Sequence, residues 1–333
     1  MLDHGHPSPA PSTGWDGSEA TPVMPSWPRI ERPLRIGLLN NMPDAAFVQT
    51  ERQFRQLIGQ DAVLAPFVFR DLPRGPIVRA HIDAHYAPHE ALAAARLDAL
   101  VVTGCEPKAQ NLDDEPFFAP LGAVVDWAAA NTVSTLFSCL ASHAAVLHLD
   151  GIRRRPLPAK HSGVYACAAV PHPLLAGMPD TVAVPHSRWN DLAEADLVAR
   201  GYTVLRRSAE IGVDLFVRET GSLFVFLQGH PEYAPDSLAR EYRRDVGRFL
   251  DGSRDTHPPL PENYFSAEAV ARLNAFAAEA QARREPELFT RFPSLAAAPP
   301  RVPSWQEPAV QLFRNWIAQV ALRRTVGAEL CAV

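Results

Sequence analysis

Short apolar runs alternate with amphipathic stretches through the first half of the chain. The apolar runs have the length and composition of buried strands and occupy residues 34–39, 62–69, 97–103 and 133–138. Helical patterns of apolar residues follow these runs at residues 45–58, 91–96, 121–131 and 140–149. Strands that alternate with helices predict an α/β fold with a parallel sheet covered by helices on both faces.

The second half of the chain predicts shorter and more mixed elements. Residues 161–227 read as short strands and loops, which indicates an antiparallel part that ends in an apolar strand at 223–227. Helical patterns follow at 235–249, at 267–284 and at 308–323, with proline-rich connections between them. We expect four parts: a disordered N-terminal tail at 1–32, a catalytic α/β domain at 33–250, a linker with an inserted helix at 251–303, and a C-terminal helix at 304–333 that packs on the domain.

Composition narrows the class of protein. The 333 residues are 47% hydrophobic and 21% charged, which is ordinary for a globular chain with a large core. A net charge of -5 does not favour nucleic acid or an anionic membrane as a partner. No apolar run approaches a membrane span, and residues 1–28 lack the apolar segment of a secretory signal. The 4 cysteines include no C-x-x-C pair and suit a reducing compartment, so we expect a cytoplasmic enzyme without a metal.

Cys139 and His230 are the positions that bear most directly on chemistry. Cys139 follows the apolar run at 133–138, and a helical stretch begins directly after it. The amides at the start of such a helix can activate a thiol and hold a developing oxyanion. His230 follows the strand at 223–227, and Glu232 stands two residues further on. A lone cysteine is more often a buried structural residue, but a thiol, an imidazole and a carboxylate at strand ends favour acyl transfer through a covalent intermediate.

Other positions offer supporting roles, each with a plainer alternative. Gly104 ends a strand and allows close backbone approach, so Gly104, Cys105 and Leu140 are the expected oxyanion-hole residues, with Cys105 as a small lining residue. Lys160, Ser187, Arg188 and Arg244 could bind a carboxylate or a phosphate from loops, although each alone is more often a solvated surface residue. The basic triplet at 153–155 could meet the phosphates of coenzyme A or could equally be a solvated loop.

Three histidines share the spacing of one helical face. His81, His85 and His89 are four residues apart, which on a helix would allow metal binding. The residues around them make a regular helix doubtful, and no acid completes a ligand set. We therefore expect a long polar connection at 71–89 that binds no metal.

A series of short motifs in order along the chain resembles the homoserine O-acyltransferases of the homoserine O-succinyltransferase type. The motifs are 38–43 (LLNNMP), 49–54 (QTERQF), 102–104 (VTG), 135–139 (TLFSC), 160–165 (KHSGVY), 185–188 (PHSR), 229–233 (GHPEY), 241–245 (EYRRD), 263–265 (NYF), 304–305 (SW) and 313–316 (FRNW). The resemblance covers roughly residues 33–320. It implies a flavodoxin-like, three-layer fold of the class I glutamine amidotransferase type, with a C-terminal helical extension.

The resemblance also implies an activity and a set of roles. Cys139 would take an acyl group from acyl-coenzyme A as a thioester, and His230, held by Glu232, would deprotonate the hydroxyl of L-homoserine. Lys160, Ser187 and Arg244 would contact the amino acid, with Arg244 suited to its carboxylate. Acyl-coenzyme A would be a co-substrate, so we expect no cofactor, only small-molecule partners, and leave a homodimer open.

The sequence departs from the family pattern at two places, and these departures leave open the acyl donor, the acceptor and the function. Asp44 and Ala45 stand where the family usually has lysine, and Lys108 aligns with the position that selects the acyl donor. A cation at 108 could pair with the free carboxylate of a succinyl group, which favours succinyl-coenzyme A. The alternatives are acetyl-coenzyme A as donor, another acceptor such as serine, a glutamine amidotransferase-like hydrolase, which Phe137 in place of glycine disfavours, or a binding protein without activity.

Overall fold

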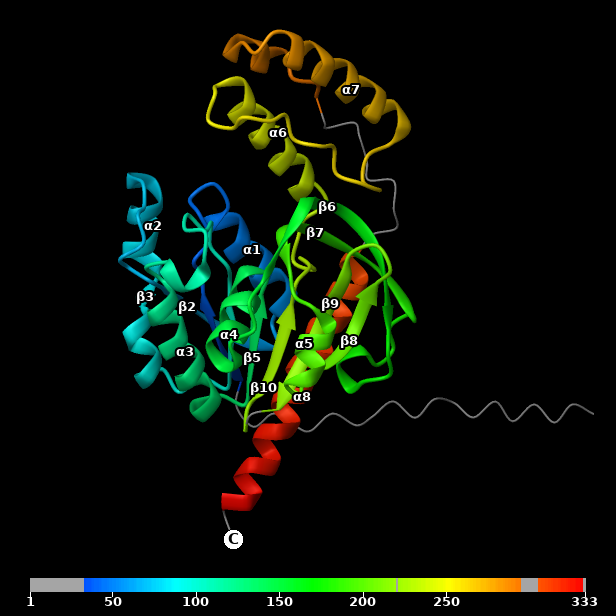
Figure 1. The fold of residues 1–333 in the computed structure, drawn as a ribbon. Helices are drawn as coiled ribbons and strands as arrows, with labels where there is room; N and C mark the ends of the chain where they lie inside the picture. Colours follow the sequence, from blue (N-terminus) through cyan, green and yellow to red (C-terminus); the bar gives the residue numbers. More distant parts are fainter. Residues whose placement is uncertain (1–32, 220, 295–304, 332–333) are drawn as a thin grey trace, which may run out of the picture.

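One mixed sheet organises the chain in the computed structural model, which describes residues 33–219, 221–294 and 305–331 (Figure 1). The described strands form a 10-stranded sheet in the order β3-β2-β1-β4-β5-β10-β9-β8-β6-β7. Their bounds are β1 Leu34–Leu39, β2 Ala62–Val68, β3 Ala87–Pro88, β4 Ala99–Val102, β5 Ser134–Ser138, β6 Arg155–Ala169, β7 Thr181–Asp191, β8 Thr203–Ser208, β9 Gly212–Glu219 and β10 Leu223–Leu227.

The sheet changes from parallel to antiparallel at β10. The pairs β2–β3, β1–β2, β1–β4, β4–β5 and β5–β10 are parallel. The pairs β10–β9, β9–β8, β8–β6 and β6–β7 are antiparallel. Strands β4, β5 and β10 are buried along their whole length, as expected for the centre of a sheet that helices cover on both faces. The predicted fold class and the antiparallel part are therefore confirmed.

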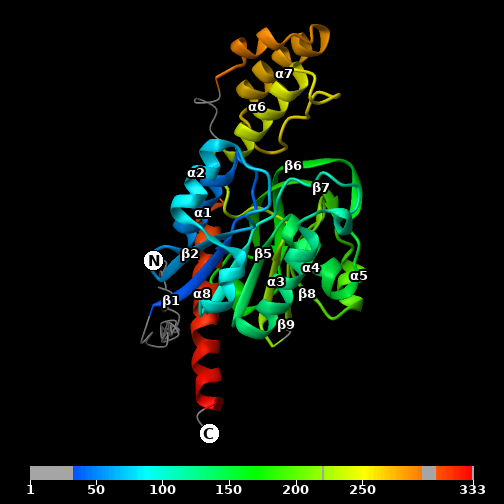
Figure 2. The same cartoon turned by 90° about the vertical axis from the view of Figure 1, so that its left-hand side faces the viewer.

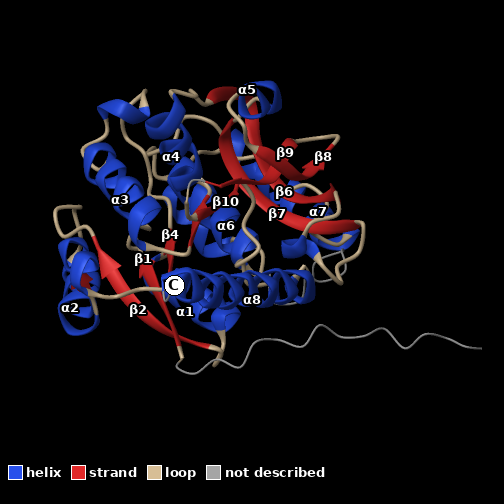
Figure 3. Cartoon of the chain, turned by 90° about the horizontal axis from the view of Figure 1, so that it is seen from below, coloured by secondary structure: helices blue, strands red, loops and turns tan. Residues whose placement is uncertain are grey.

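Helices cover both faces of the parallel half (Figure 3). Residues of α3 and α4 share one apolar cluster with one face of the sheet, and residues of α1 and α8 share a second cluster with the other face. On the second face Phe54 of α1 and Phe313 of α8 meet with ring centroids 6.0 Å apart. The helix bounds are α1 Phe47–Ile58, α2 Pro76–His85, α3 Phe118–Asn131, α4 Leu140–Asp150, α5 Glu194–Ala199, α6 Ser237–Leu250, α7 Ala267–Ala282 and α8 Gln306–Cys331.

Helices α6 and α7 stand beyond one end of the sheet, next to β6 and β7 (Figures 1 and 2). They pack on each other through an apolar cluster that includes Tyr242 and Phe249 of α6 and Leu273 and Phe276 of α7. Val164 of β6 belongs to the same cluster, so this unit is anchored to the antiparallel part of the sheet.

None of the described helices combines the length and the hydropathy that a membrane span requires.

One predicted element is wrong. Residues 71–89 were expected to form a polar connection, but α2 occupies Pro76–His85 and the 3-10 helix His89–Ala94 follows. Pro76 starts α2, and its Val78 and Ile82 are buried against Phe47. This narrow apolar stripe was hidden by the polar residues and histidines around it. The tail expected at 1–32 lies outside the described residues, and so do residues 295–304 of the proline-rich connection before the C-terminal helix.

The histidines of this segment have structural partners. His81 and His85 lie on α2 with ring centroids 4.7 Å apart. The Nε2 atom of His81 is 2.9 Å from the Glu51 carboxylate. His81 therefore joins α2 to α1, which is a structural role.

Candidate active site

Cys139 occupies a strained turn between β5 and α4. Its backbone angles are φ 51° and ψ -111°, a region that residues other than glycine rarely adopt. The Cys139 amide donates a hydrogen bond of 2.7 Å to the Leu227 carbonyl at the end of β10. The Ser142 hydroxyl donates to the carbonyls of Phe137, at 2.8 Å, and Leu227, at 3.0 Å. These bonds hold the strained turn and place Cys139 at the N-terminus of α4, beside the end of β10.

His230 lies beside this thiol and is held by Glu232. The Nδ1 atom of His230 is 2.7 Å from Glu232 Oε1, and Cys139 lies close enough to the ring to raise its pKa. Both the ring and the carboxylate are buried. Burial alone would lower the pKa of His230, but the charges of Glu232 and Cys139 outweigh it and raise this pKa well above 6.5. The environment therefore favours the protonated form of the His230 ring.

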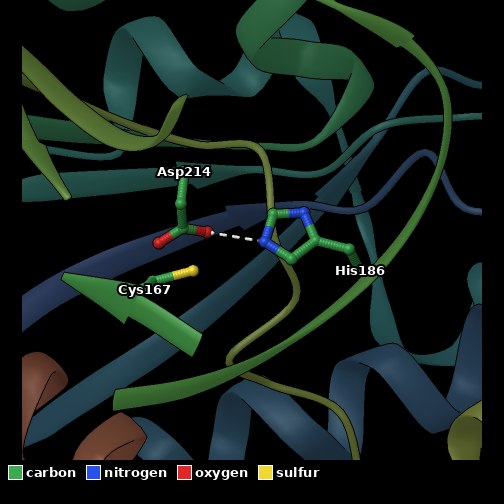
Figure 4. Close-up of side chains that lie close together, drawn as sticks. All are labelled: Cys167, His186 and Asp214. Carbon is green, nitrogen blue, oxygen red and sulfur yellow. Dashed lines mark ion pairs between the residues drawn. The ribbon is translucent and has the colours of Figure 1, made fainter. Parts of the chain in front are cut away.

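A second buried cluster, drawn in Figure 4, lies next to Gly229, the residue that precedes His230. His186 of β7 and Asp214 of β9 form a fully buried pair, with 3.0 Å between His186 Nε2 and Asp214 Oδ1. Arg206 pairs with the same carboxylate. The Cys167 sulfur also lies beside it, and the possible metal-ligand atoms of Cys167, His186 and Asp214 lie within 4.8 Å of one another. Burial lowers the pKa of His186 to about 4 and raises that of Cys167 above its usual range. Because Arg206 already supplies the positive charge for Asp214, we interpret the cluster as a charge network and not as a metal site.

Gly229 lets the loop that carries His230 pack closely against this network. A Cβ atom at Gly229 would lie 2.5 Å from Asp214 Oδ1, 2.6 Å from Val184 Cγ1 and 2.8 Å from His186 Nε2. The next residue, His230, donates its amide to the Pro185 carbonyl at 2.8 Å. The network and β7 therefore set the position of His230.

The expected oxyanion residues lie together at the start of α4. A Cβ atom at Gly104 would lie 2.8 Å from Leu140 Cβ and 3.1 Å from Leu140 N, so the loop after β4 approaches α4 closely because residue 104 is glycine. Leu140 is the first residue of α4, and its amide has no acceptor within the helix. Burial and then the Glu115 charge raise the pKa of Cys105 above its usual range, so this thiol stays protonated and does not compete with Cys139.

The three expected substrate-binding residues converge on two acids of α6. Lys160 Nζ of β6 is 3.5 Å from Glu241 Oε2 and 3.5 Å from Asp245 Oδ2. The Ser187 hydroxyl of β7 donates to Glu241 Oε2, and Arg244 Nη2 is 2.8 Å from Asp245 Oδ1. The cluster thus comes from strands and a helix, and not from loops as expected.

Tyr233 connects this cluster to His230. Its ring stacks on His230 with centroids 4.3 Å apart and 19° between the planes. Its hydroxyl donates to Glu241 Oε1. Burial would raise the pKa of Glu241, but Lys160 and the hydroxyl donors outweigh it and lower this pKa, so the carboxylate stays ionised.

Comparison with known proteins identifies the family. A family model described as homoserine O-succinyltransferase matches residues 28–326 of the chain. The chain belongs to the homoserine O-succinyltransferase family. It is 63% identical over 333 residues to a homoserine O-succinyltransferase of Methylorubrum extorquens, with 98% of this chain and 100% of that protein covered. A homoserine O-succinyltransferase of Rhodopseudomonas palustris is 50% identical over 296 residues, covering 87% of this chain and 89% of that protein. The family predicted from the short motifs is confirmed.

Solved structures with a similar arrangement include a glutamine amidotransferase from Thermotoga maritima. It is 15% identical, with a TM-score of 0.49, and covers 86% of this chain and 99% of that chain.

In this family member, the two positions that depart from the family pattern lie at one cavity. The cavity has a volume of about 400 Å³, and its lining includes Asp44, Arg74, Cys105 and Lys108. Lys108 has an exposed side chain and stands at the rim. Asp44 accepts a 2.7 Å hydrogen bond from the Gly75 amide and lies 3.4 Å from Arg74 Nη1. The carboxylate at 44 is therefore engaged by the wall and does not reach the thiol as an unpaired charge.

Two of the basic residues singled out as phosphate ligands have acidic partners. Arg153 Nη2 is 2.7 Å from Asp113, and Arg155 Nη2 is 3.5 Å from Asp191. Arg188 lies on β7, is buried and is 2.9 Å from the same Asp191 carboxylate. Arg188 therefore has a structural role within the sheet.

The sequence interpretation missed several polar residues of the site. Glu241 and Asp245 lie four residues apart on α6, where Asp245 is buried and Glu241 is half-buried, and Tyr233 follows Glu232 directly. Arg74 is the buried cation of the cavity wall. The available signal was the acidic pair at helical spacing within the 241–245 motif.

Proposed function

We propose that this chain transfers a succinyl group from succinyl-coenzyme A to the hydroxyl oxygen of L-homoserine, a step of methionine biosynthesis. The observation that carries the proposal is that His230 is hydrogen-bonded to Glu232 and has its pKa raised by both Glu232 and Cys139, in a member of the homoserine O-succinyltransferase family. The similar proteins of Methylorubrum extorquens and Rhodopseudomonas palustris bear the same enzyme name. Succinyl-coenzyme A is a co-substrate in this proposal, and no resident cofactor takes part.

The first half-reaction forms a thioester on Cys139. The thiolate attacks the carbonyl carbon of succinyl-coenzyme A and forms a tetrahedral oxyanion. The amide of Leu140 and the backbone at 104–105 stabilise this oxyanion at the N-terminus of α4. The bond to the coenzyme A sulfur then breaks, and the imidazolium of His230 gives its proton to the leaving thiolate.

The second half-reaction moves the acyl group to oxygen. Neutral His230 accepts the proton of the homoserine hydroxyl, and the oxygen attacks the thioester carbon. Collapse of the second oxyanion breaks the carbon–sulfur bond and restores the Cys139 thiolate beside the imidazolium. Glu232 holds the ring in one tautomer through both halves and stabilises its charged form.

The polar cluster of α6 suits an amino acid as the acceptor. Arg244 is the cation that matches the α-carboxylate, and Glu241 and Asp245 supply negative charge for the α-ammonium group. Lys160 and Ser187 hold these acids in place in the absence of substrate. An acceptor that carries both charges, such as homoserine, therefore fits this cluster better than water or a neutral alcohol.

Intact-mass spectrometry tests nucleophile and donor together. Mixing the protein with succinyl-coenzyme A in the absence of homoserine should add one succinyl group, and Cys139→Ala should abolish the adduct. Cys105→Ala is the matched control for the identity of the acylated thiol, because it keeps the backbone amide assigned to the oxyanion and removes only a protonated thiol, so the adduct should still form. Added L-homoserine should discharge the thioester to O-succinylhomoserine, whereas water should do so much more slowly, and faster discharge by serine would make serine the acceptor.

Other outcomes assign other functions. An adduct only with acetyl-coenzyme A would move the donor to acetyl, and release of ammonia from glutamine would indicate a hydrolase. Absence of an adduct with every donor, together with absence of product, would overturn the proposal. Homodimer formation and location in the cytoplasm stay predictions, which size-exclusion chromatography with light scattering and cell fractionation can test.

A further inference from the structure

The cavity beside Cys105 contains a buried cation whose hydrogen-bonding groups are only partly used. The Arg74 side chain is 4% exposed and lines the cavity. Its Nη1 atom donates to the Met42 carbonyl and lies 3.4 Å from Asp44. Its Nε and Nη2 atoms have no hydrogen-bond acceptor among the residues that the structure describes. Leaving charged donors buried without partners is costly, so these two groups are suited to a ligand.

The two unused donors are a matched pair. Nε and Nη2 lie on one edge of the planar guanidinium, and this edge presents two parallel N–H groups to the two oxygens of a carboxylate. The opposite side of the group is fixed, because Nη1 is bonded to the wall and the guanidinium carbon lies 4.8 Å from the centre of the Phe47 ring. Burial lowers the pKa of Arg74, and Asp44 offsets this effect only in part. A further anion would therefore stabilise the charged form.

The acids that share the cavity wall are engaged by other groups. Glu115 accepts hydrogen bonds from the amides of Lys108 and Ala109. Glu106 lies 3.0 Å from Arg248 of α6. The remaining acid of the lining, Asp71, is exposed, so it is screened by water.

The cavity is adjacent to the reacting centre. Cys105 lines the cavity and directly follows Gly104, which packs against Leu140, the residue after Cys139, and the charges of Arg74 and Cys139 both affect the pKa of Cys105. An acyl group on Cys139 whose oxyanion lies at the 104–105 backbone would have Cys105 as its neighbour. A four-carbon diacid carries its second carboxylate two methylene groups beyond the thioester carbon, so an acyl chain that extends past Cys105 would carry this carboxylate into the cavity.

The geometry points to Arg74 as the residue that recognises the free carboxylate of the succinyl group, through the Nε and Nη2 edge in the cavity beside Cys105. This inference rests on the proposed succinyl transfer and names the group that distinguishes a succinyl donor from an uncharged one. Lys108, the residue singled out from the sequence, is exposed at the rim and contributes only screened attraction.

The test compares succinyl-coenzyme A with butyryl-coenzyme A, which has the same chain length and a methyl group in place of the carboxylate. Arg74→Met should lower kcat/KM for succinyl-coenzyme A by about 10- to 100-fold, as expected for the loss of a charge-assisted bidentate pair. The butyryl reaction should stay constant or improve. Arg74→Lys keeps the charge but lacks the paired Nε and Nη2 donors, so it should lower kcat/KM for succinyl-coenzyme A by an intermediate factor. Lys108→Met should lower kcat/KM for succinyl-coenzyme A by less than Arg74→Lys does. Arg70→Met, an exposed arginine of the same segment, is the control and should match the parent protein.

Each other outcome overturns the inference. Equal losses with both donors, in a variant whose melting temperature is unchanged, would place Arg74 at the phosphates of coenzyme A, and unchanged kinetics would remove it from the site. If Arg74→Met does not fold, Arg74→Lys takes its place. The ratio of kcat/KM for succinyl-coenzyme A to kcat/KM for butyryl-coenzyme A is then compared between Arg74→Lys and the parent protein. Failure of the proposed function itself is recognised separately, because the parent protein would then form no adduct with either donor.

Discussion

Gly229→Ala should damage both stability and catalysis, although it adds one methyl group. Gly229 does not adopt a left-handed conformation, so alanine fits the backbone, and any cost comes from its neighbours. The added Cβ would meet Asp214 Oδ1 at 2.5 Å, Val184 Cγ1 at 2.6 Å and His186 Nε2 at 2.8 Å. Comfortable contacts between such atoms are about 3.5 Å or more, so each neighbour would have to move by up to about 1 Å.

The neighbours have little room to move. Asp214 and His186 are fully buried and paired with each other, and Arg206 holds the same carboxylate. Overpacking a core costs about 1–3 kcal/mol, and breaking a buried ion pair costs about 3–5 kcal/mol. Partial displacement should therefore lower the free energy of unfolding by about 2–5 kcal/mol. A shift of His230 by about 1 Å should reduce kcat/KM by about 100-fold.

Urea unfolding and steady-state kinetics on purified Gly229→Ala measure the two effects. Gly247→Ala is the matched control, because its Cβ would come no closer than 3.2 Å to the Phe289 ring and alanine favours the α6 helix. This control should change the free energy of unfolding by less than about 1 kcal/mol. If Gly229→Ala is as stable and as active as the parent protein, the network behind His230 does not set the position of the base.

Two further predictions concern charge at the site and in the core. Glu232→Gln keeps a hydrogen-bonding group at His230 Nδ1 but removes the charge that raises the His230 pKa, so kcat/KM should fall by about 100-fold and the His230 pKa followed by NMR should fall, with exposed Glu285→Gln as control; an unchanged His230 pKa would contradict this role. Burial lowers the pKa of both His143 and His186 to about 4, so below pH 6.5 the unfolded chain binds protons that the folded chain does not. Stability should therefore fall between pH 6.5 and 4, by roughly 3 kcal/mol for each histidine, and urea unfolding of His143→Gln should lose about half of this dependence; an equal slope in both proteins would refute it.

The position of the catalytic residues was predictable because it follows from strand ends. The apolar run before Cys139 and the one before His230 are strands β5 and β10, which pair in parallel with Ser138 opposite Leu227. Residues that directly follow two paired parallel strands must lie near each other at one edge of the sheet. Two sequence facts, a cysteine after one strand and a histidine after another, were therefore enough to place thiol and ring together.

The charged partners were not predictable in the same way. Lys160 and Glu241 are 81 residues apart in the chain, and their contact depends on how α6 sits against β6 and β7. Arg74 and Asp214 carry charges that composition assigns to the surface, yet both side chains are buried. Burial of a charge is decided by tertiary partners, and a single sequence does not reveal which partner compensates it.

The two halves of the site therefore have different structural origins and meet at Tyr233. The thiol, the base and the oxyanion groups follow strands of the parallel sheet, whereas Lys160, Ser187 and Glu241 come from β6, β7 and α6. Tyr233 stacks on the His230 ring and donates to Glu241, so the position of α6 is coupled directly to the position of the base. Since α6 also packs on α7 through their shared apolar cluster, the unit beyond the sheet is coupled through Tyr233 to the position of the His230 ring.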